Sequence, residues 1–182
     1  MKKKLVDMPK NDENMAIKIR KPKIEDGNLI YHLVQKCQPL DINSLYSYLI
    51  ICAHFDQTSV LAEINNEIVG YISAYINPKQ NETLFVWQVA VSPNMRGKGL
   101  ATKMINDILK REDIQPINFI ETTVTPSNKA SRSLFKKIAS QLDTNLEKFP
   151  FFTSDLFGES NHEEELLFRI GPLNKLEKEI IF

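Results

Sequence analysis

The sequence has no excess of either charge and no long apolar run, and each absence excludes a class of protein. The 23 Lys and Arg residues balance the 23 Asp and Glu residues, so the formal net charge is zero. Nucleic acids and anionic membranes attract positively charged surfaces, so neither is expected as the main partner. No apolar run reaches the ~18 residues that a membrane-spanning helix requires.

Cysteine is scarce as well. The two cysteines, Cys37 and Cys52, both lie in apolar stretches. Two isolated thiols supply neither a disulfide framework nor the spacing of a metal site, so we expect reduced thiols in the core and no metal. The basic run Lys2–Lys4 is followed by a polar stretch and not by the apolar core of a signal peptide. We therefore expect a cytoplasmic protein.

What is present indicates one globular domain. The chain has 182 residues, of which 42% are hydrophobic, enough for one sizeable core. Residues 1–14 combine high charge with few apolar residues, which predicts a disordered N-terminal segment. We expect the domain to span residues 15–173 and a C-terminal tail to follow at 174–182.

The order of the expected elements predicts an α+β fold. Strand-like runs lie at residues 16–20, 58–64, 68–76, 83–92, 117–124 and 165–170. Helical spacing of apolar residues predicts helices through Cys37, from Leu45 to Cys52, from Leu100 to Leu109 and from Ser127 to Ser140. Early strands in antiparallel pairs, followed by strands that alternate with helices, are typical of a mixed sheet.

Three local features refine this reading. Asn65-Asn66-Glu67 is expected to form a hairpin turn. Asn43 or Ser44 is expected to cap the second helix, because a short side-chain oxygen accepts from free amides there. The apolar run 83–92 predicts a central strand buried on both faces.

The segment Arg96-Gly97-Lys98-Gly99-Leu100-Ala101 lies between this strand and the next helix. Two glycines allow a tight turn whose backbone amides are unobstructed, and the helix N-terminus adds positive potential. These features suit a pyrophosphate, although a plain strand-to-helix turn also explains the glycines. No Ser or Thr follows Gly97-Lys98, which argues against a P-loop, and the third glycine of a dinucleotide fingerprint is missing.

Arg96 to Ala101 has the pattern Arg-x-x-Gly-x-Ala, and a second block runs from Thr125-Pro126-Ser127-Asn128 to Leu134-Phe135. Together they resemble the GNAT family of N-acetyltransferases over roughly residues 16–172. The resemblance implies the GNAT fold, with a mixed, mostly antiparallel central sheet flanked by helices, and acetyl-CoA as co-substrate. The cofactor contacts that it implies are Val89, Val91, Arg96, Gly97, Lys98, Gly99, Leu100, Ala101, Asn128, Ser131 and Phe135.

Three blocks in the first half, residues 39–49, 55–59 and 84–89, resemble one branch of that family more closely. Its members acetylate the 4-amino group of L-2,4-diaminobutanoate, a step in the synthesis of the compatible solute ectoine. The resemblance therefore implies a small diamine as acceptor, direct transfer in a ternary complex, a homodimer and a role in osmoadaptation. Other acceptors (a polyamine, an aminoglycoside or a protein amine) and a non-catalytic acyl-CoA-binding regulator stay open.

The chemistry requires a proton acceptor, because only about one primary amine in a few thousand is neutral at pH 7. Glu121 is a candidate, as a half-buried strand carboxylate, and an outward-facing strand Glu is the alternative. In the family a backbone N–H near Val89 would stabilise the oxyanion. Phe135 stands where many members have a Tyr that protonates the thiolate, so the thiolate leaves unprotonated or another hydroxyl serves.

A substrate with two ammonium groups calls for acidic and aromatic contacts. Asp41 is the first candidate, with helix capping as its alternative. Trp87, on the strand beside the thioester, suits a cation–π contact with the reacting amine or plain core packing. His162 and Glu165 open the last strand near the expected acceptor site, although such charged runs are often solvated turns. The expected substrate contacts are Asp41, Asn43, Tyr46, Phe85, Trp87, His162 and Glu165.

Overall fold

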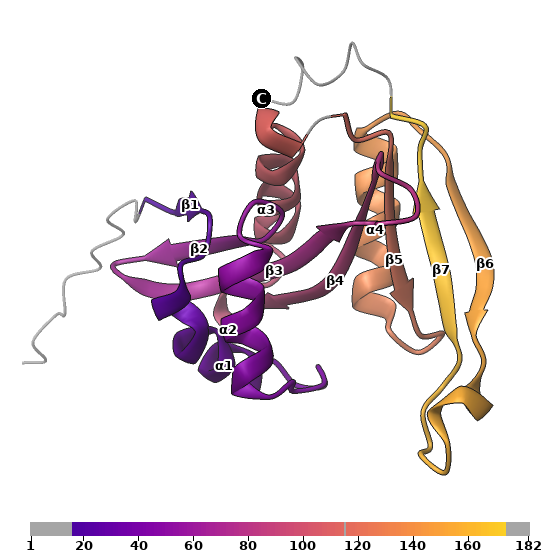
Figure 1. The fold of residues 1–182 in the computed structure, drawn as a ribbon, viewed down its shortest axis with the longest axis horizontal. Helices are drawn as coiled ribbons and strands as arrows, with labels where there is room; N and C mark the ends of the chain where they lie inside the picture. The colour runs from indigo at the N-terminus through magenta and orange to yellow at the C-terminus, as the bar shows by residue number, and fades with distance from the viewer. Residues whose placement is uncertain (1–15, 115, 174–182) are drawn as a thin grey trace, which may run out of the picture.

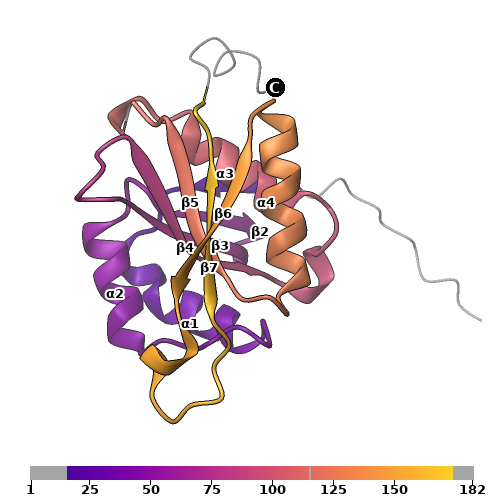
Figure 2. The ribbon, with the colours of Figure 1, turned by 90° about the vertical axis from the view of Figure 1, so that its right-hand side faces the viewer.

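The computed structural model describes residues 16–114 and 116–173, which form one seven-stranded sheet with helices on both faces (Figures 1 and 2). The strand order is β1-β2-β3-β4-β5-β7-β6. All neighbouring strands are antiparallel except β4 and β5, which run parallel. The predicted α+β class with a mixed, mostly antiparallel sheet is confirmed. The segments predicted at 1–14 and 174–182 lie outside the described residues.

The first half of the described chain supplies one side of the sheet and two helices. Its elements are β1 (Lys18–Arg20), η1 (Ile24–Asp26), α1 (Gly27–Gln35), α2 (Leu45–His54), β2 (Val60–Ile64), β3 (Glu67–Ile76) and β4 (Thr83–Val91). The second half adds η2 (Pro93–Met95), α3 (Leu100–Leu109), η3 (Glu112–Ile114), β5 (Phe119–Val124), α4 (Lys129–Gln141), β6 (Leu146–Phe152), η4 (Ser154–Phe157) and β7 (Glu165–Ile170).

The two faces of the sheet carry separate apolar clusters. On one face α3 and α4 pack against alternate strand residues, and the largest buried side chains include Ile72, Leu84, Met104, Ile105, Phe135 and Phe168. On the other face α1 and α2 cover β2, β3 and β4 only, through Ile30, Val34, Tyr48, Leu61, Tyr71 and Ala90. The cluster on the α1/α2 face includes no residue of β5, β7 or β6, so that end of the sheet lies beyond the two helices.

Local sequence explains the turns and caps. Asn65 and Asn66 have φ of 50° and 64°, as a two-residue hairpin turn requires and as Asn tolerates. Ser44 caps α2, since its side chain accepts from the N–H of Ser47. Asn128 caps α4 by accepting from the N–H of Ser131 at 3.0 Å. The alternative role of Asp41 as the helix cap is therefore wrong.

Two expectations about strands need correction. No element was predicted at residues 146–152, which form the edge strand β6. Pro150 lies at a register irregularity there, consistent with the confinement of proline to edges and bulges. The strand at 83–92 is not buried on both faces throughout, because Trp87 is 50% exposed. The reason is a bulge in β4, described below.

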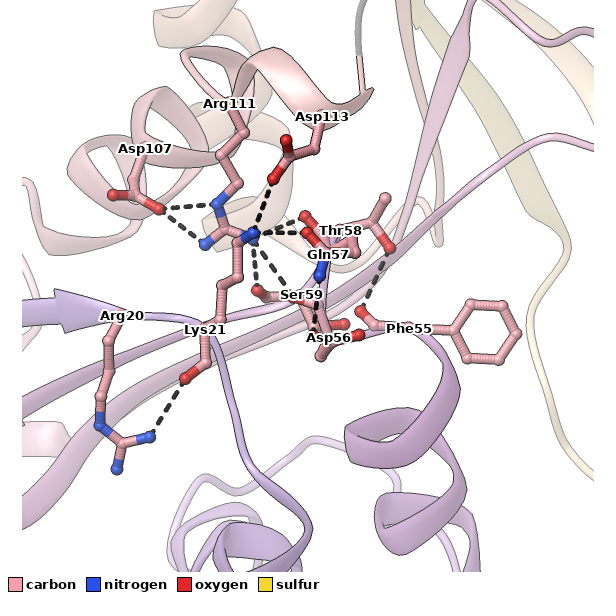
Figure 3. Close-up of polar contacts among 10 residues, drawn as sticks. All are labelled: Arg20, Lys21, Phe55, Asp56, Gln57, Thr58, Ser59, Asp107, Arg111 and Asp113. Carbon is pink, nitrogen blue, oxygen red and sulfur yellow. Dashed lines mark hydrogen bonds and ion pairs between the residues drawn. The ribbon is translucent and has the colours of Figure 1, made fainter.

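Arg111 ties the far end of α3 to the turn between α2 and β2 (Figure 3). Its guanidinium donates to the carbonyl oxygens of Gln57 at 2.7 Å and Ser59 at 2.8 Å. It also pairs with Asp107 on α3 at 2.7 Å. A cation at the C-terminal end of a helix interacts favourably with the helix dipole. The N-terminus of the helix anchored in this way lies at the glycine-rich turn.

Candidate active site

The site begins where β4 and β5 separate. Thr83 to Phe85 of β4 pair with Phe119 to Glu121 of β5, but both strands continue beyond this pairing, to Val91 and Val124. Figure 1 shows the two strands diverging toward their C-terminal ends. Backbone groups between diverging strands have no ladder partner across the gap. The opening therefore leaves polar backbone of a central strand available to a ligand.

A cavity of about 410 Å³ lies at this opening. Its walls come from the end of β4, the glycine-rich turn, the start of α4 and the segment that follows α1. Nine of the expected cofactor contacts line it: Val89, Val91, Arg96, Gly97, Gly99, Leu100, Ala101, Asn128 and Ser131. Sequence segments about 90 residues apart thus form one cleft, large enough for an extended ligand.

The glycine-rich turn is shaped to receive a ligand rather than a side chain. Gly97 and Gly99 both have φ of +75°, a left-handed conformation that glycine adopts without strain. A Cβ built on either glycine would meet no atom within 4 Å, so nothing of the protein packs against these positions. Gly99 is also the N-cap of α3. Free amides and the helix dipole suit this turn to the phosphates of CoA.

Trp87 owes its position to a β-bulge. Ser73 of β3 pairs with Gln88, and the next residue, Ala74, pairs with Val86, so Trp87 is an extra residue in β4. Bulges disrupt the ladder locally and redirect a side chain, and they recur beside active sites. Here the bulge lies where β4 has already left β5. The indole is half exposed and borders a smaller cavity next to α2.

Glu165, at the start of β7, is a partly buried carboxylate without a full set of partners. Its Oε2 is buried and accepts no hydrogen bond from the described residues, while Oε1 lies 3.9 Å from Nε2 of His162. Burial raises the pKa of Glu165 above the ordinary glutamate value, and the nearby negative charge of Asp41 adds to this. A hydrogen bond from Thr123 and the charge of His162 act in the opposite direction.

His162 is held in one orientation beside this carboxylate. Its Nδ1 lies 2.7 Å from the carbonyl oxygen of Glu163, which only accepts, so Nδ1 carries a hydrogen. Its ring stacks on Phe157 with the centroids 3.9 Å apart. Nε2 therefore faces Glu165. The negative charge of Asp41 acts on Glu165, so the turn before α2 and the start of β7 bring two carboxylates within electrostatic range of each other.

The position of Glu121 argues against its expected role as proton acceptor. It is 4% exposed, but its carboxylate forms an ion pair with Arg169 of β7. Arg169 also stacks over the ring of Phe119 at 3.9 Å. Glu121 lies at the last β4–β5 pairing and does not line the cavity. The Arg169 guanidinium already occupies this carboxylate, so Glu165 replaces it as the candidate.

Several other expected contacts lie elsewhere. Phe135 is 1% exposed within the core under α4 and does not line the cavity, so no cofactor contact is visible for it. Lys98 is exposed and is also absent from the cavity wall. The ring of Phe85 packs against that of Tyr75 in a tilted arrangement, with centroids 5.2 Å apart. Tyr46 is 70% exposed on the first turn of α2, so its ring does not pack between the helices.

One wall of the cleft is not among the cofactor contacts expected from the sequence. Cys37, Gln38, Pro39 and Leu40, which follow α1, line the cavity together with residues of α4 such as Leu134 and Lys137. Within residues 39–49 the only expected contacts are Asp41, Asn43 and Tyr46, all with the amine substrate. Proline and apolar residues directly before Asp41 were the available signal, since a polar turn has no need of them.

Comparison with known proteins agrees with this architecture. The sequence pattern of the acetyltransferase (GNAT) family matches residues 28–139. The chain belongs to the GNAT family. Among curated GNAT relatives, L-2,4-diaminobutyric acid acetyltransferase of Marinococcus halophilus is 46% identical over 160 residues, covering 88% of this chain and 92% of that protein. The enzyme of the same name from Methylotuvimicrobium alcaliphilum is 44% identical over 161 residues, covering 88% and 94%.

A solved GNAT structure is similar over the same range. It is diaminobutyrate acetyltransferase EctA from Paenibacillus lautus in complex with its substrate L-2,4-diaminobutyric acid and coenzyme A. The TM-score is 0.85 at 37% identity, with 88% of this chain and 98% of that chain covered. The cavity of this GNAT domain, between β4 and the start of α4, is thus part of a fold seen with CoA bound in a relative.

The described residues contain neither a metal-type cluster nor a membrane-spanning helix. Within the described residues no group of three or more His, Cys, Asp or Glu side chains is arranged to hold a metal ion. None of the helices in residues 16–114 and 116–173 combines the length and hydropathy that crossing a bilayer needs. Cys37 and Cys52 are both buried free thiols, as expected.

Trp87→Leu is expected to weaken the binding of the amine substrate without weakening that of acetyl-CoA. If the indole meets the ammonium, its loss should raise the KM of the amine by an amount equivalent to about 1–2 kcal/mol. The KM of acetyl-CoA and the melting temperature should change little, because Trp87 is half exposed. Steady-state kinetics with each substrate varied provide the measurement. Phe55→Leu, which truncates another aromatic of the same small cavity, is the control; equal effects of both changes would contradict the cation–π role.

Proposed function

We propose that this protein transfers the acetyl group of acetyl-CoA to the 4-amino group of L-2,4-diaminobutanoate. The product is N4-acetyl-diaminobutanoate, the acetylated precursor of the compatible solute ectoine. The observation that carries the proposal is an identity of 46% with a diaminobutyric acid acetyltransferase over nearly the whole of both chains. Two carboxylates that act on each other, those of Asp41 and Glu165, agree with an acceptor that carries two ammonium groups.

Acetyl-CoA fits the cleft at both of its walls. The amides of the glycine-rich turn and the N-terminus of α3 suit the pyrophosphate, while the apolar side chains of Val89, Val91 and Leu134 suit the pantetheine arm. The thioester then lies near the β4 bulge, where backbone N–H groups are free of the ladder. Such a donor stabilises the oxyanion of the tetrahedral intermediate.

Glu165 is the proposed proton acceptor. The 4-ammonium group must lose a proton before its nitrogen attacks the acetyl carbon, and Oε2 of Glu165 has no competing hydrogen bond among the described residues. Burial raises the pKa of this carboxyl, which brings it closer to neutral pH and improves it as a base. The neutral amine adds to the acetyl carbon to form the C–N bond, and the tetrahedral intermediate then collapses with cleavage of the C–S bond. The nitrogen loses its second proton in this step, either to the departing sulfur, so that CoA leaves as the thiol, or to solvent, so that CoA leaves as the thiolate.

Asp41 is proposed to bind the second ammonium of the substrate, the one at the α-carbon. Its charge reaches Glu165, and it has no role as a helix cap, which belongs to Ser44. Asp41→Asn keeps the shape and removes the charge. We expect kcat/KM for diaminobutanoate to fall by an amount equivalent to about 2–3 kcal/mol of transition-state stabilisation. This is the range for the loss of a hydrogen bond to a charged group.

The Asp41→Asn measurement needs two checks. The KM of acetyl-CoA and the melting temperature should stay near those of the unmodified protein, since Asp41 is exposed. Asp56→Asn, a carboxylate in the turn after α2 and away from the pocket, serves as the control. Wild-type turnover by the Asp41 variant would remove this residue from the site.

A panel of amines tests the function itself. The purified protein is assayed with acetyl-CoA and diaminobutanoate, ornithine, lysine, a polyamine and an aminoglycoside, with release of CoA thiol and product mass as readouts. The proposal expects diaminobutanoate to have the highest kcat/KM and acetylation at N4. A polyamine or aminoglycoside as the best substrate would replace it.

We also propose a homodimer that acts in the cytoplasm during osmoadaptation. Phe149, Phe151, Phe152 and Leu156 on and after β6 are between 41% and 66% exposed. A group of exposed large apolar side chains on an edge strand is typical of an interface. The mass in solution, measured by sedimentation, should therefore be twice that of the chain, and a monomer at micromolar concentration would contradict this.

A further inference from the structure

A buried hydrogen-bond network joins β4 to the turn that carries Asp41. Nε2 of Gln88 donates to the carbonyl oxygen of Asp41 at 2.8 Å. The hydroxyl of Tyr48 donates to Oε1 of Gln88 at 3.2 Å and accepts from the N–H of Asn43 at 3.2 Å. Gln88 is 8% exposed and Tyr48 is fully buried. Two side chains thus hold both ends of the Asp41–Asn43 segment.

This segment has no other support from regular structure. It lies between the end of α1 and the Ser44 cap of α2, and Asp41 and Ile42 are exposed. Its preceding residues, Gln38 to Leu40, line the CoA-type cavity. Each residue held in one conformation loses roughly 1–2 kcal/mol of entropy, so an exposed turn stays ordered only where specific bonds offset that cost.

Gln88 connects this turn to the reacting part of the site. It directly follows Trp87, the bulged residue of β4. The strand that borders the thioester and the turn that carries the acidic group are therefore linked by one side chain. Tyr48 is itself packed edge-on against Tyr71 and Tyr31 at centroid distances of 6.0 and 6.2 Å, which leaves its hydroxyl little freedom.

We propose that Gln88 and Tyr48 are positioning residues that hold the Asp41 turn at the distance from β4 which amine binding requires. The proposal rests on the proposed function, because it takes Asp41 as the contact of the second ammonium. Neither side chain touches the substrate. They act by keeping Asp41 oriented before the amine substrate binds. Loss of this orientation reduces both the binding of the amine and the rate of its acetylation.

Tyr48→Phe and Tyr71→Phe form a matched pair. Both remove a hydroxyl that is buried in the same aromatic cluster, but only the hydroxyl of Tyr48 bonds to Gln88 and to the N–H of Asn43. Only Tyr48→Phe breaks the network. In hydrogen exchange measured by NMR, the amide of Asn43 should exchange about 10-fold faster or more in Tyr48→Phe. In Tyr71→Phe its exchange should be unchanged.

The exchange measurement uses no substrate, so it separates this inference from the proposed function. If the amine panel selects another acceptor but Asn43 is deprotected only in Tyr48→Phe, the function fails and the anchoring of the turn stands. If diaminobutanoate is the substrate but the two variants exchange alike, the network does not hold the turn and the inference is overturned.

Kinetics then test positioning against a merely structural role. Gln88→Leu and Tyr48→Phe should each raise the KM of diaminobutanoate by about 5- to 20-fold, in line with the loss of one or two buried hydrogen bonds. Tyr71→Phe should not. In the double variant of Gln88→Leu with Asp41→Asn, the fold-increase in the KM of diaminobutanoate should be less than the product of the two single increases. The reason is that an Asp41 already displaced by Gln88→Leu contributes little to binding, so removing its charge has a smaller effect. Fully multiplicative effects would overturn the proposal.

Discussion

Replacing Glu165 by Gln is expected to lower kcat for acetyl transfer by about 10²- to 10⁴-fold, the usual contribution of a general base. Gln keeps the size and polarity of the side chain but cannot accept the proton of the ammonium. The KM of acetyl-CoA should change little, because Glu165 does not line the cavity of the glycine-rich turn. Single-turnover kinetics with saturating substrates measure the chemical step directly.

The same substitution should remove the acid limb of the pH profile. Because burial raises the pKa of Glu165, kcat of the unmodified enzyme should fall with acid at a pH above the ordinary glutamate value. In Glu165→Gln this limb should disappear from the residual activity. Glu164→Gln, an exposed neighbour, should keep both rate and profile. Residual activity of Glu165→Gln with an unchanged acid limb would assign the base elsewhere.

The thermal stability of Glu165→Gln provides an independent check, because the substitution should lower activity but should not lower the melting temperature. A carboxyl whose pKa is higher in the folded than in the unfolded state binds its proton more tightly when folded. Its contribution to stability is therefore greatest below the unfolded value near 4.5 and is lost as pH rises through the folded value. At pH 7 the ionised Glu165 costs stability, so Glu165→Gln should melt at the same or a higher temperature. Near pH 4 the difference should vanish.

Gly99→Val is expected to raise the KM of acetyl-CoA by about 10- to 100-fold. A β-branched residue at φ of +75° is strained by about 1–2 kcal/mol. Its side chain would also project into space that no protein atom occupies, at the N-terminus of α3. Each lost charge-assisted hydrogen bond to a phosphate adds about 1.5–3 kcal/mol. The KM of the amine should change much less; equal changes for both substrates would argue against a phosphate site here.

Strain alone must be separated from loss of the ligand contact. Asn66 has φ of 64° in the hairpin between β2 and β3 and is exposed. Asn66→Val introduces comparable strain far from the cavity, so it should lower the melting temperature without changing either KM. Calorimetric titration of both variants with CoA measures the affinity directly. A loss of affinity in Gly99→Val but not in Asn66→Val is then attributed to the glycine-rich turn.

The features that short stretches of sequence determine were predicted correctly. The turn at Asn65-Asn66 and the cap at Ser44 depend on residues only a few positions apart. The last strand, Glu165–Ile170, was predicted with its observed bounds. The glycine-rich turn is another such local feature, because neighbouring residues determine both its positive φ angles and the start of the helix that follows. These local signals, together with the order of elements, are sufficient for the fold class and the cofactor cleft.

The acceptor side depended on contacts between distant segments. Glu121 and Glu165 are both strand carboxylates, and only the pairing of β5 with β7 places Arg169, 48 residues away, against Glu121. Gln88 meets the Asp41 turn across 47 residues. Trp87 is half exposed because β4 gains one residue relative to β3. Sheet register decides which carboxylate is neutralised and which stays free, and register is a property of the packed sheet.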